Sequence, residues 1–479
     1  MRARRGRFPT LALAALLAYG ARLPALAATT YDVQIRGSMF MPAELHIAPG
    51  DTVRWTAVDE GHTVTADDGQ FDFFKTRTLA QGERVQWTAP TRDVTVGYYC
   101  RVHGARGGLG MAGAIVVGRG SPRPRAQASG PRRTVPSAAF PTIARGVAGA
   151  RPGTVVTVLP GVYRESVVIR ERDITLRGGG RTASAVVLDG GLTLDTGITV
   201  VTSGVTVSGV TLRRYRTAGI VFRGATKFSA VEVQTRDNDL YGVRVEGSTG
   251  GLIDRAYAAG ALDAGISVAD CADCGVVVRR SGADDNAAGV LITGSDGVVV
   301  RDSTFRRNAT GVVVKTMPGG TVTSAVHIYG NTVVDNAVAN VRVRPPSDAL
   351  DLPAGVGIWL AGANSVLVER NRVAGDVYGV ALTALGLPAN GNRVIDNVVS
   401  RSSAADVAWD GIGAGSCFAR NTTPDGWSAS AEPRLAESTY SCSLPTTVGV
   451  PDPKVLADIT THAYRTYYCR LVQPATCAP

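Results

Sequence analysis

The sequence predicts an all-β protein, in which an N-terminal β-sandwich is followed by a right-handed parallel β-helix solenoid. The 479 residues include 57 Gly and 24 Pro but only 6% aromatic residues, which favours short strands and tight turns over helical bundles. Apolar residues alternate with period two in short runs between residues 31 and 117. From Gly197 onward, a Gly-Ile or Gly-Val step recurs about every 23 residues.

The first 27 residues have the pattern of an export signal. They combine five arginines and no acid with the apolar run Leu11–Tyr19 and small residues near Ala27. We expect a secretory signal cleaved near Ala27 rather than an anchoring helix, because the apolar run is about half the ~20 residues that span a bilayer. No later segment is apolar enough to span a membrane, so the mature protein is expected to be periplasmic or extracellular.

Residues 118–137 form a second basic segment, with five arginines, several prolines, no acid and almost nothing apolar to bury. We expect a basic Pro/Arg-rich linker here. The formal net charge of +10 therefore lies mainly in the signal and the linker, and the domains on either side are nearly neutral. This distribution argues against nucleic acid as a partner.

The N-terminal domain, residues 28–117, reads as six or seven short strands separated by turn signals such as Pro49-Gly50-Asp51. It carries four possible soft-metal ligands, namely His62, Cys100, His103 and Met111. Two imidazoles, a thiolate and a weak axial thioether are the donors of a type 1 copper site. Structural zinc is the main competing interpretation, but zinc gains little from a thioether.

Each ligand also has a structural explanation, since a lone His is usually a satisfied polar residue and a lone Met is often core filler. The cysteine count decides between them. The chain has seven cysteines, all in the exported part, so at least one thiol cannot be in an intramolecular disulfide. An exported thiol is usually oxidised unless a metal holds it.

The stretch from Phe40 to Val117, with its MFMPAELHIAPGDTVRW start, its His-Thr-Val element and its Cys-x-x-His…Met loop, resembles the cupredoxins of the plastocyanin and pseudoazurin type. The resemblance implies a copper domain with His62, Cys100, His103 and Met111 as ligands. It departs from the family in one respect, because seven residues separate His103 from Met111, where plastocyanin-like loops usually have fewer.

The solenoid is expected over residues 138–425. The Gly steps lie at Gly197, Gly219, Gly242, Gly265, Gly289, Gly311, Gly357 and Gly379. Their spacings are 22 to 24 residues, apart from one of 46, which we interpret as two turns of 23. Two or three Val-rich runs per repeat fit a parallel β-helix, whose coils bury apolar side chains in a shared core.

The segment before the repeats, PTIARGVAGARPGTVVTVLPGVYRESVVIRERDITLRGGG, looks like the first coils of the pectin-lyase-like superfamily. This resemblance implies the fold and leaves the activity open, because the fold hosts lyases, hydrolases, epimerases and non-catalytic binders.

Acidic residues in the repeats are candidates for catalysis. Asp263, Asp284 and Asp285 recur at related points of successive coils and could form an acid pair. The competing interpretation is a structural ladder, because Asn308 and Asn336 take similar places later and short polar side chains cap tight turns. A stripe of arginines, which includes Arg213, Arg214, Arg236, Arg279, Arg280, Arg306 and Arg307, could face an acidic glycan or could be a solvated edge.

Six cysteines remain for disulfides. Cys271 and Cys274 are expected to form a local bridge. Four cysteines near the end, Cys417, Cys442, Cys469 and Cys477, are expected to form two bridges that staple a C-terminal cap at 426–479. We prefer Cys417 with Cys442 and Cys469 with Cys477.

The leading hypothesis is an exported type 1 copper protein that passes single electrons to or from a redox partner protein, with the β-helix as a scaffold or carbohydrate-binding surface. The alternative is an extracellular polysaccharide-active enzyme, a lyase, hydrolase or epimerase of a cell-wall or other glycan, with an accessory copper domain. A second alternative is copper storage or delivery. Whether the protein is an enzyme stays open, with the sequence leaning against it.

Overall fold

The computed structural model describes residues 28–36, 39–41, 44–58, 60–73, 78–105, 109–118, 131–336, 354–423, 440–444 and 457. The chain divides into two compact units, residues 1–128 and 129–479. The predicted signal at 1–27, most of the predicted linker, and Cys469 and Cys477 of the predicted cap lie outside the described residues. None of the described helices is long and apolar enough to cross a membrane.

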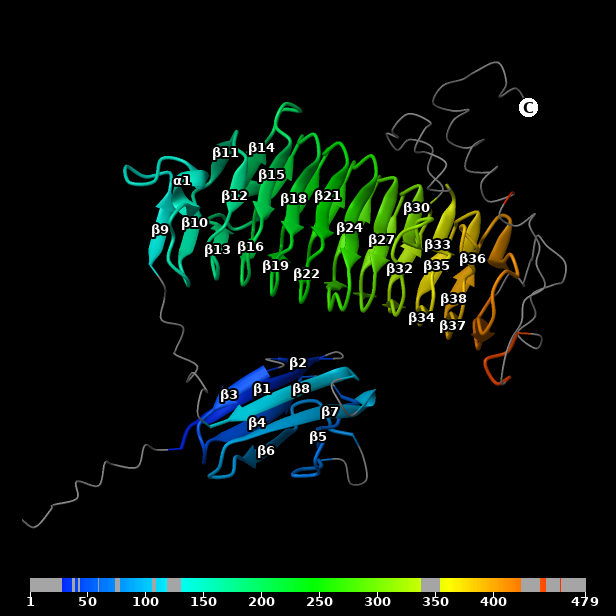
Figure 1. Cartoon of the computed structure of the whole chain (residues 1–479), viewed down its shortest axis with the longest axis horizontal. Coiled ribbons are helices and arrows are strands. Elements are labelled where there is room, and N and C mark those ends of the chain that lie inside the picture. Colours follow the sequence, from blue (N-terminus) through cyan, green and yellow to red (C-terminus); the bar gives the residue numbers. More distant parts are fainter. Residues whose placement is uncertain are drawn as a thin grey trace, which may run out of the picture. The chain divides into compact units, whose positions relative to one another are not determined.

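The N-terminal unit contains two four-stranded sheets (Figure 1). One has the order β2-β1-β4-β6 and the other β3-β8-β7-β5. The strands are β1 Thr30–Arg36, β2 Met39–Met41, β3 Glu44–Ile47, β4 Thr52–Ala57, β5 Thr65–Ala66, β6 Arg84–Thr88, β7 Val94–Ala105 and β8 Leu109–Val117. Strands β1, β3, β4 and β6 coincide with period-two runs of the sequence, because alternate side chains of a strand point to the same face. Strands β7 and β8 are longer than their runs, so Cys100, His103 and Met111 lie in strands and not in the expected loop.

One apolar cluster takes residues from both sheets. Ile35 and Trp55 come from the first sheet, and Tyr98, Cys100 and Ile115 come from the second. Two sheets that share one core are what the predicted sandwich requires. The finer assignment to the cupredoxin fold stays a prediction.

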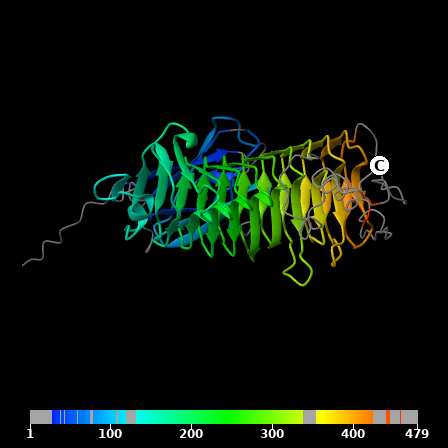
Figure 2. The ribbon, with the colours of Figure 1, turned by 90° about the horizontal axis from the view of Figure 1, so that it is seen from above.

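The second unit is a parallel β-helix, in which each coil from β10 to β39 contributes one strand to each of three sheets, and β9 and β40 extend the first sheet at its two ends (Figures 1 and 2). We number the sheets 1 to 3 in the order in which a coil meets them. Sheet 1 contains β9 Arg132–Val135, β10 Val155–Val158, β13 Thr175–Gly178, β16 Thr206–Ser208, β19 Ser229–Val231, β22 Leu252–Asp254, β25 Val277–Arg279, β28 Val299–Arg301, β31 His327–Tyr329, β34 Leu367–Glu369, β37 Arg393–Ile395 and β40 Cys417–Ala419.

Sheets 2 and 3 complete the coils. Sheet 2 contains β11 Gly161–Tyr163, β14 Val186–Asp189, β17 Thr211–Arg213, β20 Gln234–Arg236, β23 Tyr257–Ala259, β26 Gly282–Asp284, β29 Thr304–Arg306, β32 Thr332–Val334, β35 Arg372–Ala374 and β38 Val398–Ser400. Sheet 3 contains β12 Val167–Ile169, β15 Thr196–Val200, β18 Ala218–Arg223, β21 Tyr241–Glu246, β24 Ala264–Cys271, β27 Ala288–Ser295, β30 Thr310–Lys315, β33 Val356–Ala361, β36 Tyr378–Thr383 and β39 Ala405–Trp409. A 3-10 turn, Ala183–Ala185, precedes β14.

The recurring glycines form a column at the second position of the sheet 3 strands. A Cβ atom added at Gly242 would lie 2.5 Å from the carbonyl oxygen of Gly265 and 2.4 Å from the Thr235 hydroxyl. A Cβ atom at Gly289 would lie 2.5 Å from the carbonyl oxygen of Gly311. The repeat therefore keeps glycine where the backbone of the next coil approaches most closely.

Polar ladders close two of the turns. Between sheets 2 and 3, Asn286 donates its backbone N–H to Asn308, Asn308 to Asn336, and Asn336 to Asp376. Between sheets 1 and 2, a second ladder runs Ser281, Ser303, Asn331, Asn371, Asn397, Asn421. The predicted structural role of Asn308 and Asn336 is confirmed, because buried turn N–H groups need such acceptors.

The spacing of 46 residues between Gly311 and Gly357 was wrongly interpreted as two turns. Strand β30 pairs directly with β33, and Val312 is in register with Ile358. The segment is therefore one coil whose additional residues lie in its turns, where extra chain does not disturb the ladder.

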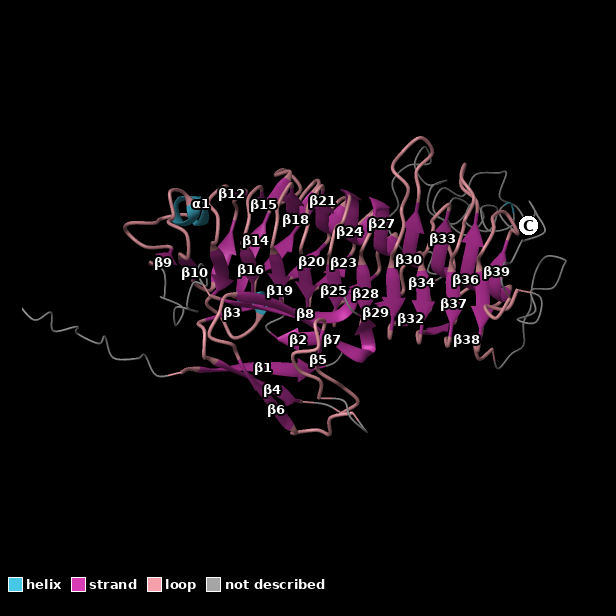
Figure 3. Cartoon of the chain, turned by 60° about the horizontal axis from the view of Figure 1, so that its bottom comes forward, coloured by secondary structure: helices cyan, strands magenta, loops and turns pink. Residues whose placement is uncertain are grey.

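The solenoid also begins earlier than residue 138. Strand β9 pairs in parallel with β10, so the predicted linker loses its last residues to the first coil. Arg133 donates to the carbonyl oxygens of Gly146, Ala148 and Gly149 at the C-terminal end of helix α1, Ile143–Val147. A cation is favourable at that end of a helix. Figure 3 shows α1 beside the first coils.

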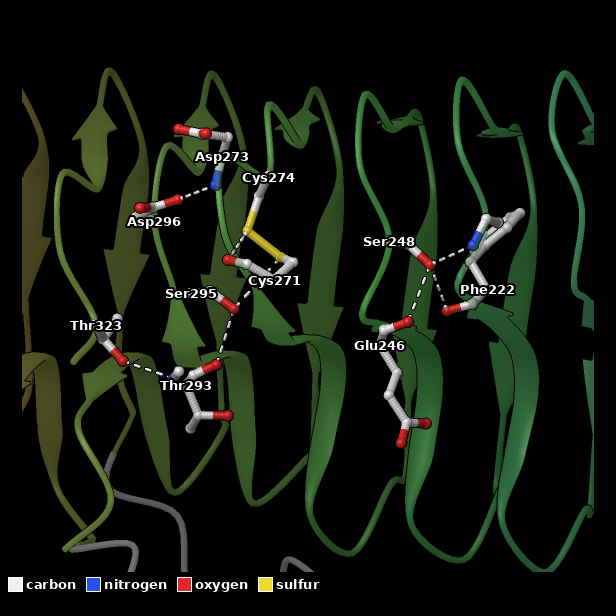
Figure 4. Close-up of a disulfide and its surroundings, with 12 residues drawn as sticks. Phe222, Glu246, Ser248, Cys271, Asp273, Cys274, Thr293, Ser295, Asp296 and Thr323 are labelled. Atoms are coloured by element: carbon white, nitrogen blue, oxygen red, sulfur yellow. Dashed lines mark hydrogen bonds between the residues drawn. A yellow bond between two sulfur atoms is a disulfide. The ribbon is translucent and has the colours of Figure 1, made fainter. Parts of the chain in front are cut away.

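Two of the three predicted disulfides are present. Cys271 bonds to Cys274 and Cys417 bonds to Cys442. The first bridge occupies a turn in which neighbouring coils carry the hydroxyl groups of Ser248 and Ser295 (Figure 4). The second ties β40 to the segment around Tyr440, whose ring packs on Trp409. Only residues 440–444 and 457 of the predicted cap at 426–479 are described, so the cap stays a prediction.

Candidate functional site

Cys100 stands at an irregularity between strands β7 and β8. Tyr99 pairs with Ala112 and Gly104 pairs with Gly110, so the four residues from Cys100 to His103 lie opposite the single residue Met111. Such a bulge re-aims side chains that a regular ladder would alternate. The backbone thus brings three of the four predicted ligand positions to one place.

The fourth predicted ligand, His62, precedes the other three in the sequence. His62 and Thr63 are buried in the turn that precedes β5. The backbone N–H of Thr63 donates to Cys100 Sγ at 3.4 Å. The Thr63 hydroxyl accepts the backbone N–H of Arg101 at 2.7 Å. Two hydrogen bonds therefore connect Thr63, the neighbour of His62, to Cys100 and Arg101.

An outer pair of contacts holds the same two segments together. Asp72 accepts hydrogen bonds from the Thr65 hydroxyl at 3.0 Å and from Arg101 at 2.6 Å. Tyr98 lies two residues before Cys100 in strand β7. Burial raises the pKa of Tyr98 to about 12, and its ring lies against that of Trp55. Tyr98 thus belongs to a packed aromatic cluster.

The donor set fits a thiolate-binding metal. Cys100 is a buried thiol, and a hydrogen bond from a backbone N–H stabilises the charged form of a sulfur that accepts it. Side chains of His103 and Met111 lie outside the described residues, so only their strand positions are known. Among the described side chains, no group of three or more His, Cys, Asp or Glu is gathered.

Thr63 is the functional residue that sequence reasoning missed. Its signal was the His-Thr-Val element itself, in which the residue next to a ligand offers both an N–H and a hydroxyl. Nothing in the sequence indicates which partners these groups find.

The predicted acids of the β-helix are not brought into one column. Asp263 is in register with Ala287 of the next coil, because Ala264 pairs with Ala288. Asp285 follows Asp284 at the end of β26, and the preceding coil has Gly260 at that place. The register places Asp263 opposite a position three residues after Asp284, so the three acids do not stack in one column.

Asp284 is instead held between arginines of the next coil. Its Oδ2 accepts from Arg306 Nε at 2.8 Å and Arg307 at 3.0 Å, and from the Tyr257 hydroxyl at 3.2 Å. Arg307 also binds Asp285. A carboxylate with three donors has little capacity left for proton transfer to a ligand.

The same clamp recurs along the solenoid. Asp189 binds both Arg213 and Arg214, and the hydrogen bond from Arg214 is the largest of the effects that lower its pKa to about 2. Asp254 binds Arg279 and Arg280. Six of the seven arginines of the predicted stripe are thus paired with acids of the preceding coil, whereas Arg236 lies over the Tyr257 ring. This arrangement favours a structural role over the recognition of an acidic glycan.

Comparisons with known proteins fall mainly on the second unit. A family model described as "Right handed beta helix region" matches residues 196–373, which confirms the predicted right-handed β-helix. No curated protein matches the chain.

Solved structures similar to this chain include two that cover more than half of it. The A-module of the Azotobacter vinelandii mannuronan C-5 epimerase AlgE4 is 15% identical, with 56% of this chain and 86% of that chain covered and a TM-score of 0.39. Alginate lyase from Paenibacillus sp. str. FPU-7 is 14% identical, with coverages of 60% and 93% and a TM-score of 0.36. An oxidised amicyanin variant is 22% identical, with coverages of 18% and 80% and a TM-score of 0.15.

Proposed function

We propose that the N-terminal unit of this exported protein holds one copper ion and passes single electrons to a redox partner protein. The observation that supports this most is the hydrogen bond from the Thr63 N–H to the buried thiol of Cys100, directly beside buried His62. Copper would supply reversible one-electron chemistry at this place. Two disulfides among the described residues agree with an oxidising compartment, periplasmic or extracellular.

The residues that would hold the ion are His62, Cys100, His103 and Met111. Thr63 would restrain both the sulfur of Cys100 and the turn of His62, so that these two groups would keep their positions when the charge of the bound ion changes. Preorganised donors of this kind lower the reorganisation that accompanies each electron transfer.

The test uses residues 28–479, expressed in full and titrated with Cu(II). Visible absorption and electron paramagnetic resonance should report an intense thiolate-to-copper band that Cys100→Ser removes. The double variant Cys271→Ser/Cys274→Ser is the matched control, because it removes sulfur elsewhere and should keep the band. A wild type without the band rejects the copper-thiolate site. Metal that a mild chelator exchanges rapidly, without a reversible redox couple, indicates storage or delivery instead.

The second candidate is an extracellular polysaccharide-active enzyme, with the copper unit as an accessory. It agrees better with the comparisons than the copper function does. The family model and the longer matches fall on the β-helix, and two of those proteins are named as a mannuronan epimerase and an alginate lyase. Its test is the release of unsaturated ends or epimerised residues from a panel of uronic-acid polymers.

Within this candidate, the acids chosen from sequence are poorly placed. Activity should survive Asp263→Asn and the pair Asp284→Asn/Asp285→Asn, apart from the loss of stability caused by the freed arginines. Loss of turnover in a variant that is still folded would restore the acid pair.

A further inference from the structure

A polar cluster lies on the outer face of sheet 1, away from the acids chosen from sequence. His327 and Tyr329 are the first and last residues of β31, and Glu369 is the last residue of β34. Tyr329 is in register with Glu369, and Arg370 follows at the turn. His327 is the one histidine between residues 131 and 461 of the sequence. All described residues of the second unit lie within this range.

The four side chains contact one another. His327 Nε2 lies 3.1 Å from Glu369 Oε1, and the ring of His327 lies 4.3 Å from that of Tyr329. Arg370 pairs with Glu369 and reaches over the Tyr329 ring at 5.7 Å. The hydrogen bond with His327 is the largest of the effects that lower the pKa of Glu369 to about 2, so Glu369 is a permanent acceptor for the imidazole.

Exposure differs across the cluster in a way that suits a binding site. The side chain of Glu369 is 14% exposed, that of His327 is 32% exposed and that of Arg370 is 55% exposed. A partly buried carboxylate that orients a more accessible imidazole, with a cation beside it, is an arrangement used for proton transfer.

Other faces of the solenoid offer less for such chemistry. On sheet 3, the positions Leu291, Val313 and Trp359 are apolar and at most 6% exposed. On sheet 2, Asp284 is already held by Arg306 and Arg307. The His327 cluster therefore combines, within the described β-helix, an imidazole, a carboxylate and a guanidinium in mutual contact with access of the imidazole and the guanidinium to solvent.

We propose that His327 is the proton-transferring residue of a site on sheet 1 that binds a uronic-acid polysaccharide. Glu369 is its positioning residue, and the Tyr329 ring is an apolar platform for a sugar face. Arg370 is 55% exposed and has N–H groups besides the one that pairs with Glu369, and these hold the sugar carboxylate. The inference rests on the second candidate function and is independent of copper.

The step that suits this set of groups is β-elimination. The C5–H bond breaks and its proton passes to His327, the electron pair forms the C4=C5 double bond, and the C4–O bond breaks. The leaving oxygen then takes the proton from His327. No oxidant, reductant or water is consumed, and the guanidinium of Arg370 offsets the charge that develops next to the carboxylate.

The experiment uses residues 28–479 with polymannuronate, polyguluronate and polygalacturonate, and with dextran as the neutral control polymer. Binding is measured by affinity electrophoresis and turnover by the ultraviolet absorbance of the new double bond. The variants are His327→Gln, Glu369→Gln and Glu369→Asp. Arg420→Gln is the matched control, because Arg420 occupies the same turn position two coils later and pairs with Asp396.

We expect His327→Gln to lose about 100-fold or more in kcat while polymer binding and the unfolding temperature stay close to wild type. Glu369→Gln should lower kcat with KM unchanged, and Glu369→Asp should restore part of it. Arg420→Gln should behave as wild type.

Three results would overturn the inference. If the wild type cleaves a polymer and His327→Gln cleaves it equally well, the site is wrong while the polysaccharide function stands. If the wild type binds a polymer without producing a double bond, the proton-transfer role is rejected. If the wild type neither binds nor cleaves any of the uronic-acid polymers, the polysaccharide function fails together with the site.

Discussion

Thr63 contacts the segment of Cys100 with both of its polar groups, because its backbone N–H donates to Cys100 Sγ at 3.4 Å and its hydroxyl accepts from the Arg101 N–H at 2.7 Å. One residue thus connects the turn of His62 to the bulge of strand β7. The two groups are separable by mutation, since a side-chain change leaves the N–H in place.

Thr63→Val removes the hydroxyl acceptor and keeps both the shape and the N–H to sulfur bond. The Arg101 N–H then lacks its acceptor, so the free energy of unfolding of the N-terminal unit should fall by about 1–3 kcal/mol. Urea denaturation of the copper-free protein measures this. Thr52→Val is the matched control, because the Thr52 hydroxyl pairs with that of Thr88 at an exposed position, and a change of less than about 0.5 kcal/mol is expected there. Equal effects would mean that the Thr63 hydroxyl has no special role.

Asp254→Ala should be among the most destabilising changes in the solenoid. Arg279 beside it is almost buried, so removing the carboxylate leaves an uncompensated charge. A loss of about 3–5 kcal/mol is expected. Asp396→Ala breaks the more exposed pair with Arg420 and should cost about 1 kcal/mol or less. Thermal unfolding of the two variants compares them directly, and a similar loss in both would contradict the importance of burial.

Asp376→Asn should stabilise the protein at neutral pH. Burial raises the pKa of Asp376 well above its usual 3.8, and the side chain takes a ladder position that Asn286, Asn308 and Asn336 fill in earlier coils. As pH rises above about 4, the unfolded chain releases this proton while the folded chain retains it, so the native state loses stability. The variant removes that loss. A higher unfolding temperature at pH 7, with no gain below about pH 4, is the expected result; a lower temperature at pH 7 would contradict it.

Acid should weaken the solenoid through two carboxylates whose pKa values are lowered to about 2. Asp189 is held by Arg214 and Glu369 by His327. Their ordinary values are 3.8 and 4.5, so their contribution is complete above about pH 5 and is lost as pH falls toward 2. Circular dichroism melts between pH 7 and pH 2 should follow this course. Glu369→Gln should flatten it, and an unchanged profile in that variant would mean that the pair with His327 adds no stability.

The two disulfides should differ in what they contribute. Cys271 and Cys274 close a loop of sequence separation 3, whereas Cys417 and Cys442 close one of 25. Chain-entropy arguments give about 2 kcal/mol for the first and about 3–4 kcal/mol for the second. The double Ser variants, compared by urea denaturation, test this order. Ser at position 271 also extends the hydroxyl column of Ser248 and Ser295, so a loss at this bridge larger than that at Cys417–Cys442 would contradict the expectation.

The sequence was a good guide where a residue type has one physical use. The Gly column predicted the coils, the short interval from Cys271 to Cys274 predicted their bridge, and the preferred pairing of Cys417 with Cys442 is confirmed, although sequence alone does not determine it. The sequence was a poor guide where residue spacing or composition alone had to indicate the number of coils or the start of a strand. The interval from Gly311 to Gly357 contains additional turn residues, and Arg132 and Arg133 looked like linker although they begin the first strand.

Side-chain partners were the part that sequence could not supply. Asp284 looked like a catalytic acid because its arginine partners lie a full coil away in the sequence. His327 is the one histidine between residues 131 and 461 of the sequence, but its carboxylate partner Glu369 lies 42 residues later. Contacts between stacked coils depend on the register, which turn lengths determine and composition does not reveal.

The glycine column also limits how this domain can change its length. Each of these glycines lies against the carbonyl oxygen of the next coil, so residues cannot be added within a strand without displacing the backbone above it. Length can therefore change in the turns, as between Gly311 and Gly357, or by whole coils such as residues 265–288. Duplication therefore lengthens the domain by whole coils, and each added coil extends the surface while the cross-section stays the same.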